Sequence, residues 1–176
     1  MTIEGDEGSL SGRLQTPRKI FDARLLNEPL KTLPSRPPVV VSPTDSVTVA
    51  VRVMQRESRG CVLVTADGTA RSNLLGIFSD RDVLHRIVGR GKDPVLLPVA
   101  EVMTPEPESL PVEATIAWVL NKMAIGGFRH VPVVNALNHP QFVVSVRDVV
   151  DFLVEFFPRE ILGLPPLPDA ARRAGG

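Results

Sequence analysis

Two short sequences of the form Ser-x-x-Asp place a hydroxyl group and a carboxylate at a fixed spacing. The first joins Ser79 to Asp82, and the second joins Ser145 to Asp148, 66 positions later. At the start of a helix such a pair satisfies backbone N–H groups, which stabilises a protein by about 1 kcal/mol and needs no ligand. A carboxylate only accepts hydrogen bonds, so the pair also suits a ligand's hydroxyl groups and repels a phosphate. The spacing alone leaves a helix cap and a ligand site both open.

No catalytic motif accompanies these pairs. The sequence contains no Gly-x-x-x-x-Gly-Lys-Ser phosphate loop, no Gly-x-Gly-x-x-Gly and no His-Glu-x-x-His. The three histidines, His85, His130 and His139, share no metal-ligand spacing. Cys61 lies inside an apolar run, where a thiol is usually inert. We therefore expect a binding protein, not an enzyme, with no metal and no required cofactor.

The composition excludes several classes of protein. The 176 residues include 20 basic and 20 acidic side chains, and this balance argues against nucleic-acid binding, which depends on clustered Lys and Arg. No apolar run approaches the roughly 20 residues that span a bilayer, and the first residues are acidic and polar, unlike a signal peptide. A single cysteine excludes an internal disulfide. We expect a cytoplasmic protein that does not contact the membrane.

The two Ser-x-x-Asp pairs belong to a longer internal repeat. Upstream of them, four apolar residues at helical spacing occur in each copy: Val47, Ala50, Val51 and Met54 match Ile116, Val119, Leu120 and Met123. Each copy reads strand, helix, strand, strand, helix. The expected strands are 39–41, 61–65 and 74–78, then 109–111, 130–134 and 142–145; the expected helices are 45–57 and 80–88, then 114–125 and 147–156.

Proline-rich stretches mark the expected boundaries, since each proline removes a backbone donor. They suggest an N-terminal extension at 1–33, a first repeat at 34–95, a second repeat at 96–160 and a Pro-rich C-terminal tail at 161–176. One copy has too few residues for its own core. The predicted fold is therefore α+β, with two β-α-β-β-α repeats packed as one pseudo-two-fold pair.

Several sequences within this repeat resemble the CBS (cystathionine beta-synthase) domain family. They are the run from Gly76 to Asp82, the linker Val102-Met103-Thr104-Pro105, and the run from Gly127 to Val134 in the second repeat. The resemblance covers roughly residues 33 to 158. It implies a stand-alone CBS-domain pair, in which two such repeats share a ligand cleft.

The resemblance also implies a set of binding residues for an adenosine ligand. In that family Ser79, Asp82, Ser145 and Asp148 would hold the ribose. A phosphate needs cations elsewhere, and Arg129 and His130 are the candidates in the second repeat, with Arg59 near the matching place in the first. Thr104 of the Met-Thr-Pro sequence completes the expected site. Gly76 aligns with Phe142, which would either close one cleft or supply a stacking surface for a base.

The expected function is a regulatory sensor that binds AMP, ADP, ATP or a related adenosine compound and signals through helix packing to an unknown regulated protein. The alternatives are a ligand-independent interaction module, in which both pairs are only caps, and a sensor of S-adenosylmethionine or a divalent cation. Thermal unfolding with adenosine compounds separates them.

The second copy carries more apolar residues than the core of one repeat requires, and these suggest a homodimer. In the second helix of each copy, two quartets account for the core: Val83, Leu84, Ile87 and Val88, and Val149, Val150, Leu153 and Val154. The second copy adds Phe152 and Phe156 where the first has Arg86 and Arg90. Trp118 also lies off the face that carries the other apolar residues of its helix. The alternatives for these side chains are a subunit interface, which family resemblance favours, and coverage by residues 1–33 or the tail.

Overall fold

Each repeat folds into a small sheet with two α-helices, and the computed structural model describes residues 23–156. The first repeat has the order β1 (Val40–Val41), α1 (Val47–Glu57), β2 (Cys61–Thr65), β3 (Leu74–Ser79) and α2 (Asp80–Arg86). The second has β5 (Leu110–Pro111), α3 (Ile116–Gly126), β6 (His130–Val134), β7 (Pro140–Ser145) and α4 (Val146–Phe156). The predicted α+β repeat is confirmed. The expected tail at 161–176 lies outside the described residues, as do residues 1–22 of the expected extension.

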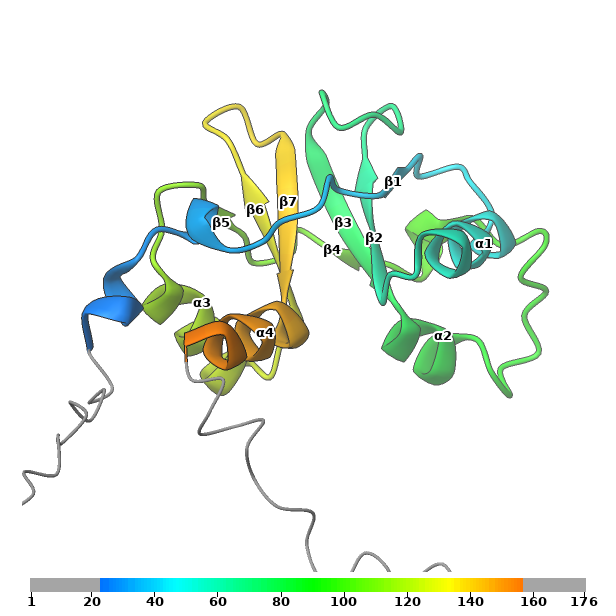
Figure 1. Cartoon of the computed structure of the whole chain (residues 1–176). Helices are drawn as coiled ribbons and strands as arrows, with labels where there is room; N and C mark the ends of the chain where they lie inside the picture. Colours follow the sequence, from blue (N-terminus) through cyan, green and yellow to red (C-terminus); the bar gives the residue numbers. More distant parts are fainter. Residues whose placement is uncertain (1–22, 157–176) are drawn as a thin grey trace, which may run out of the picture.

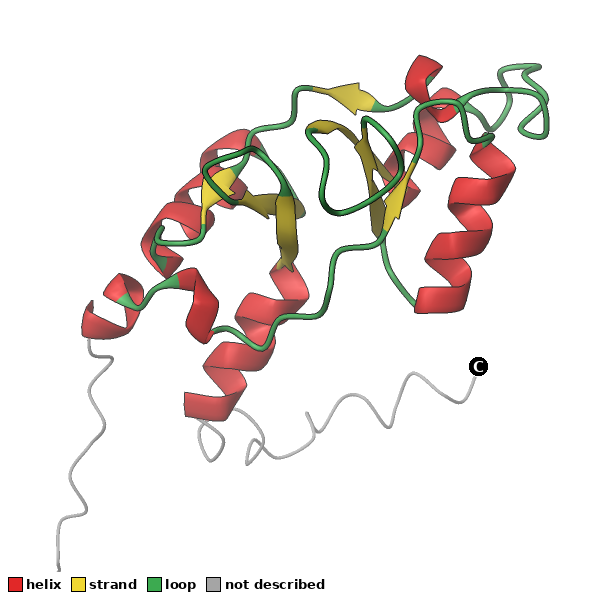
Figure 2. Cartoon of the chain, turned by 90° about the horizontal axis from the view of Figure 1, so that it is seen from above, coloured by secondary structure: helices red, strands yellow, loops and turns green. Residues whose placement is uncertain are grey.

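The two sheets have the same topology. β1 runs parallel to β2 and β2 antiparallel to β3, while β5 runs parallel to β6 and β6 antiparallel to β7. The registers also match, because Cys61 lies opposite Ser79 and His130 lies opposite Ser145. Each Ser-x-x-Asp pair therefore begins at the end of a hairpin, with a residue of the neighbouring strand beside it. Seen from above, the strands lie between helices on either side (Figure 2).

The first sheet gains a short fourth strand that the sequence did not indicate. β4 (Thr104–Pro105) pairs antiparallel with β3 and places Thr104 opposite Ile77. It follows a 3₁₀ turn at Val99–Glu101, called η3, whose residue Val99 is fully buried in the core of the first repeat. The connection between the repeats thus packs against the first one.

The N-terminal segment makes the complementary contact with the second repeat. Two 3₁₀ turns, η1 (Ala23–Asn27) and η2 (Leu30–Thr32), lie beside α3, and the chain then crosses to β1 in the first repeat (Figure 1). The Leu30 N–H donates to the Ala114 carbonyl at 2.8 Å. Leu30 and Leu33 are buried in the second core. Each repeat is therefore covered by a segment from outside its own five elements.

In α2 and α4, the last helix of each repeat, the buried faces differ from the predicted ones. Leu84 and Val88, expected in the first core, are 62% and 60% exposed, and Val150 of α4 is 49% exposed. Phe152, expected at a subunit interface, is instead 5% exposed within the second core. The interface assignment of Phe152 is therefore wrong, because residues such as Leu30 cover this face of α4 from within the chain. The Phe156 side chain lies outside the described residues.

Helix α2 is also shorter than predicted. It ends at Arg86, and the residues that follow form turns before Gly89, which adopts a φ of 70°. Glycine reaches this left-handed conformation without steric cost, so the chain turns at Gly89, three residues beyond the end of the helix. Among the residues that the structure describes, no helix combines the length and apolar character needed to cross a bilayer.

Candidate functional site

The second Ser-x-x-Asp pair forms the cap that its spacing allows. The backbone N–H and the hydroxyl of Ser145 both donate to Oδ2 of Asp148, each at 2.6 Å. The Asp148 N–H donates back to the Ser145 hydroxyl oxygen at 3.3 Å. Within residues 23–156, no hydrogen bond or ion pair reaches the second carboxylate oxygen, Oδ1. The cap therefore uses one oxygen of Asp148 and leaves the other without a partner among the described residues.

The first pair makes the same contacts but has an additional partner. The N–H and the hydroxyl of Ser79 donate to Oδ2 of Asp82 at 2.8 and 2.7 Å. The guanidinium of Arg86, four residues along α2, lies 3.2 Å from Oδ1 of Asp82. Both carboxylate oxygens of Asp82 are thus engaged within the chain.

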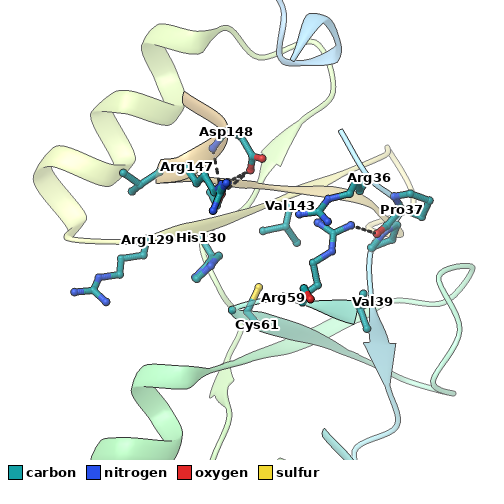
Figure 3. A pocket seen from close by; sticks show the side chains of 15 residues that line it. Arg36, Pro37, Val39, Arg59, Cys61, Arg129, His130, Val143, Arg147 and Asp148 are labelled. Atoms are coloured by element: carbon teal, nitrogen blue, oxygen red, sulfur yellow. Dashed lines mark hydrogen bonds between the residues drawn. The ribbon is translucent and has the colours of Figure 1, made fainter. Parts of the chain in front are cut away.

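Asp148 lies in a cavity of about 250 Å³ between the repeats. Arg36 and Arg59 lie on one side of it and His130 on another, while the Arg129 side chain points away from the two arginines (Figure 3). The Arg59 guanidinium donates to the carbonyl of Pro37 at 3.1 Å. Apolar atoms of Pro38, Val39 and Val143 complete the walls. We call this space the Asp148 cavity.

A second cavity, of about 440 Å³, lies beside the first pair. Its walls include Ser79 and Asp82 from the first repeat, Thr104 from the connection between the repeats, and Phe128 from the second repeat. Arg129 and His130 line both cavities. We call this space the Asp82 cavity.

The predicted site residues are therefore divided between the two cavities. Ser145, Asp148 and Arg59 belong to the Asp148 cavity, whereas Ser79, Asp82 and Thr104 belong to the Asp82 cavity. The two cavities share Arg129, which precedes β6, and His130, the first residue of β6.

The charges of the two cavities differ. Four arginines line the Asp148 cavity, Arg36, Arg59, Arg129 and Arg147, and Asp148 is the one acidic residue among its described lining residues. The Asp82 cavity instead carries four acidic residues, Asp80, Asp82, Glu106 and Glu108, against Arg81, Arg86 and Arg129. The Asp148 cavity thus suits an anionic ligand with one hydroxyl-rich part, and the Asp82 cavity is more nearly balanced.

Burial shifts the pKa values of three titratable groups at the Asp148 cavity. Partial burial and the neighbouring guanidinium of Arg36 lower the pKa of Arg59, and the negative charge of Asp148 offsets part of this lowering. Burial also lowers the pKa of His130, against the opposing effects of Asp80 and Asp148. For Cys61, burial raises the pKa to about 12, so the thiol stays protonated and unreactive.

Comparison with known proteins assigns the repeat. The family model of the CBS domain matches residues 30–89 and 99–155, which together hold both hairpins and both Ser-x-x-Asp pairs. The chain belongs to the CBS-domain family. The CBS domain-containing protein CBSCBSPB1 of Arabidopsis thaliana is 34% identical over 154 residues, a match that covers 84% of this chain and 27% of that protein. The chain thus spans about a quarter of the length of this relative.

Solved structures of other proteins share the fold. A CBS-domain containing protein from Agrobacterium tumefaciens is 30% identical and superposes with a TM-score of 0.59, covering 67% of this chain and 90% of that one. An uncharacterized conserved protein from Pyrococcus horikoshii, 23% identical, superposes with a TM-score of 0.63 over 73% of this chain and 93% of its own. The CBS-domain pair, a generally regulatory ligand-binding module, is therefore the architecture of this chain.

Some residues of this CBS pair were missed or misplaced by sequence reasoning. Arg36 and Arg147 line the Asp148 cavity, although nothing in their local sequence distinguishes them from other surface arginines. Arg86 was missed as a partner of Asp82, although the i, i+4 spacing of opposite charges on a helix signals it. Phe142 neither closes a cleft nor offers a stacking surface, because it is buried in the second core. Its neighbour Val143 faces the cavity instead.

Proposed function

We propose that this CBS-domain pair binds an adenosine nucleotide in the Asp148 cavity and acts as a regulatory sensor without catalytic activity. The observation that carries the proposal is the Asp148 carboxylate, which has one oxygen without a protein partner among the described residues and lies in a cavity rich in arginine. A carboxylate oxygen accepts hydrogen bonds from vicinal ribose hydroxyls, and arginines bind phosphate oxygens in pairs.

The remaining walls support the same ligand. Burial and, second to it, the neighbouring guanidinium of Arg36 lower the pKa of Arg59, so a phosphate bound beside the two arginines would offset the repulsion of their like charges. Pro38, Val39 and Val143 offer apolar contacts to a base. S-adenosylmethionine, whose sulfonium is cationic, suits this concentration of arginines less well. The described residues hold no group of three or more His, Cys, Asp or Glu side chains arranged to bind a metal.

One observation favours the alternative, a ligand-independent interaction module. Both Ser-x-x-Asp pairs form complete caps within the chain, so their presence has a structural reason even without a ligand. The two functions differ in whether the folded protein binds nucleotides at all, and a titration decides between them.

Isothermal titration with adenosine, AMP, ADP and ATP tests the proposal, with Arg59→Ala as the diagnostic variant. Loss of a charged hydrogen bond costs about 1.5–3 kcal/mol, so Arg59→Ala should bind the phosphorylated ligands about ten- to a hundredfold more weakly. Its affinity for adenosine should change little. Flat titrations of folded wild-type protein with all four ligands at millimolar concentration would reject the proposal.

Arg56→Ala provides the matched control. Arg56 lies three residues earlier in the chain, pairs with Glu57 at 2.9 Å, and its side chain is 72% exposed. It does not line the Asp148 cavity. This substitution removes the same charge from the same region and should leave all four affinities unchanged. An equal loss in both variants would mean that net charge, and not a contact of Arg59, controls nucleotide binding.

We also propose that two chains form a homodimer through exposed apolar side chains of the helices. Trp118 of α3 is 58% exposed, and Leu84 of α2 is exposed to a similar degree. Exposed apolar surface of this kind usually marks an association site. Phe152 takes no part in it, since the ring is already buried in its own core.

A further inference from the structure

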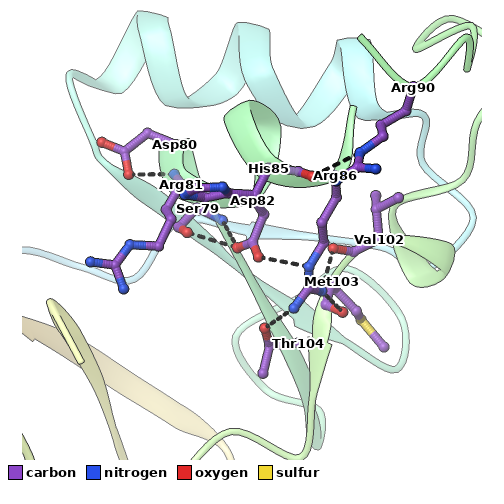
Figure 4. A network of polar contacts seen from close by, with 10 residues as sticks. All are labelled: Ser79, Asp80, Arg81, Asp82, His85, Arg86, Arg90, Val102, Met103 and Thr104. Carbon is purple, nitrogen blue, oxygen red and sulfur yellow. Dashed lines mark hydrogen bonds and ion pairs between the residues drawn. The ribbon is translucent and has the colours of Figure 1, made fainter. Parts of the chain in front are cut away.

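The side chain of Arg86 lines the Asp82 cavity and pairs with the carboxylate that was predicted to hold a ribose. Besides its ion pair with Asp82, its Nη1 donates to the carbonyls of Val102 and Met103 at 2.8 and 2.6 Å. Its Nη2 donates to the Thr104 hydroxyl at 3.1 Å. All three guanidinium nitrogens are thus used, and they hold two of the residues predicted to bind a ligand (Figure 4).

Among its described residues, the second repeat has no equivalent contact. The residue that corresponds to Arg86 is Phe152, whose ring is buried in the core and cannot donate to a carboxylate. Oδ1 of Asp148 consequently has no hydrogen-bond or ion-pair partner among the described residues, whereas Oδ1 of Asp82 has Arg86. One exchanged residue therefore makes two otherwise equivalent sites unequal.

We propose that Arg86 acts as an internal ligand that closes the first-repeat site, so that each chain binds a single nucleotide, in the Asp148 cavity. A ribose at Asp82 must displace the guanidinium from two carbonyls, a hydroxyl and a carboxylate, and these groups then lose their partner. At Asp148 the same ribose displaces no protein group. This inference rests on the proposed nucleotide binding.

The charge of the Asp82 cavity agrees with a closed site. Its acidic residues include Glu106, near Thr104, which opposes the phosphates of any nucleotide, whereas the charge of Glu108 is paired with Lys122. Arg86 offsets part of that negative charge while it remains in place. Removing Arg86 should therefore open the site to adenosine, which is neutral, more readily than to ATP.

Titration with adenosine tests the closure by counting sites. We expect one adenosine per wild-type chain and two per chain in Arg86→Ala. Arg86→Gln, which keeps a shorter polar side chain but loses the guanidinium, should show the same gain with a weaker second site. Arg90→Ala is the control, because Arg90 contacts the carbonyl of His85 and does not contact Asp82. It should keep one site.

A second set of variants assigns the sites. Asp148→Ala should abolish adenosine binding, and Asp148→Ala combined with Arg86→Ala should regain one site, now at Asp82. Two sites in the wild type, or one site in both Arg86 variants, would overturn the closure while leaving nucleotide binding intact. Flat titrations of the wild type and of every variant would reject the proposed function, and the closure with it. Thermal unfolding confirms that each variant is folded.

Discussion

The burial of Phe152 makes a quantitative prediction about stability. The ring is 5% exposed and shares an apolar cluster with Leu30, Leu33 and Val149. Truncating a buried phenylalanine removes its transfer free energy and leaves a cavity, which together cost about 3–5 kcal/mol. Phe152→Ala should therefore lower the free energy of unfolding by about that amount. Val150→Ala on the same helix is the control, because Val150 is 49% exposed and such surface changes stay within about 0.5 kcal/mol.

Urea unfolding followed by circular dichroism measures the difference in the free energy of unfolding, and thermal unfolding measures the shift in Tm. For a chain of this size each kcal/mol shifts Tm by about 2–4 °C, so Phe152→Ala should lower Tm by roughly 6–20 °C, and Val150→Ala should lower it by no more than about 2 °C. Sedimentation of the same samples reports the oligomeric state. It separates a weakened core from a weakened interface.

One pattern of results would refute the argument. If Phe152→Ala unfolds at nearly the same urea concentration as Val150→Ala, the ring contributes little to the core. If Phe152→Ala also dissociates a wild-type dimer into folded monomers, the ring lies at the interface that the sequence suggested. The burial of Phe152 against the N-terminal segment would then be wrong.

Two further predictions concern pH and association. Burial lowers the pKa of His130 below its ordinary value of 6.5, so the unfolded chain binds a proton more readily than the folded one. The free energy of unfolding should therefore fall as the pH drops below that value. His130→Asn should make this fall shallower. If urea unfolding shows the same dependence of the free energy on pH for the wild type and the variant, the prediction is contradicted. For the homodimer, Trp118→Arg should give a folded monomer in sedimentation, because it places a charge where the exposed ring would be buried; a variant that remains dimeric would exclude Trp118 from the interface.

The order of elements was predictable because local signals fix it. The apolar residues of α1 and α3 recur at helical spacing, and the hairpin strands are short apolar runs rich in β-branched residues. β4 carries no such signal: it has two residues, one of them proline, and pairs only because the inter-repeat connection runs beside β3. Local pattern thus identifies elements that have their own periodicity, and it misses those that depend on a distant neighbour.

The buried face of α4 was not predictable for a related reason. Its sequence carries apolar residues on more than one face, since Val149, Val150, Phe152 and Leu153 follow one another closely. Which of them is buried depends on what covers the helix, and Leu30 and Leu33 are more than 100 residues away in sequence. The same limit applies to the site, where Arg36 reaches the Asp148 cavity from the crossing segment.

The two repeats are covered by different segments, and this difference explains how two similar repeats hold unequal sites. The first repeat receives the inter-repeat connection, whose carbonyls at Val102 and Met103 are acceptors for Arg86. The second receives the N-terminal segment, whose leucines form an apolar surface in the cluster that contains Phe152. The same helix position is therefore polar in one repeat and apolar in the other. Because this position stands four residues after the Asp of each pair, Asp82 has an ion-pair partner on its own helix, whereas the buried Phe152 ring offers no charged group to Asp148.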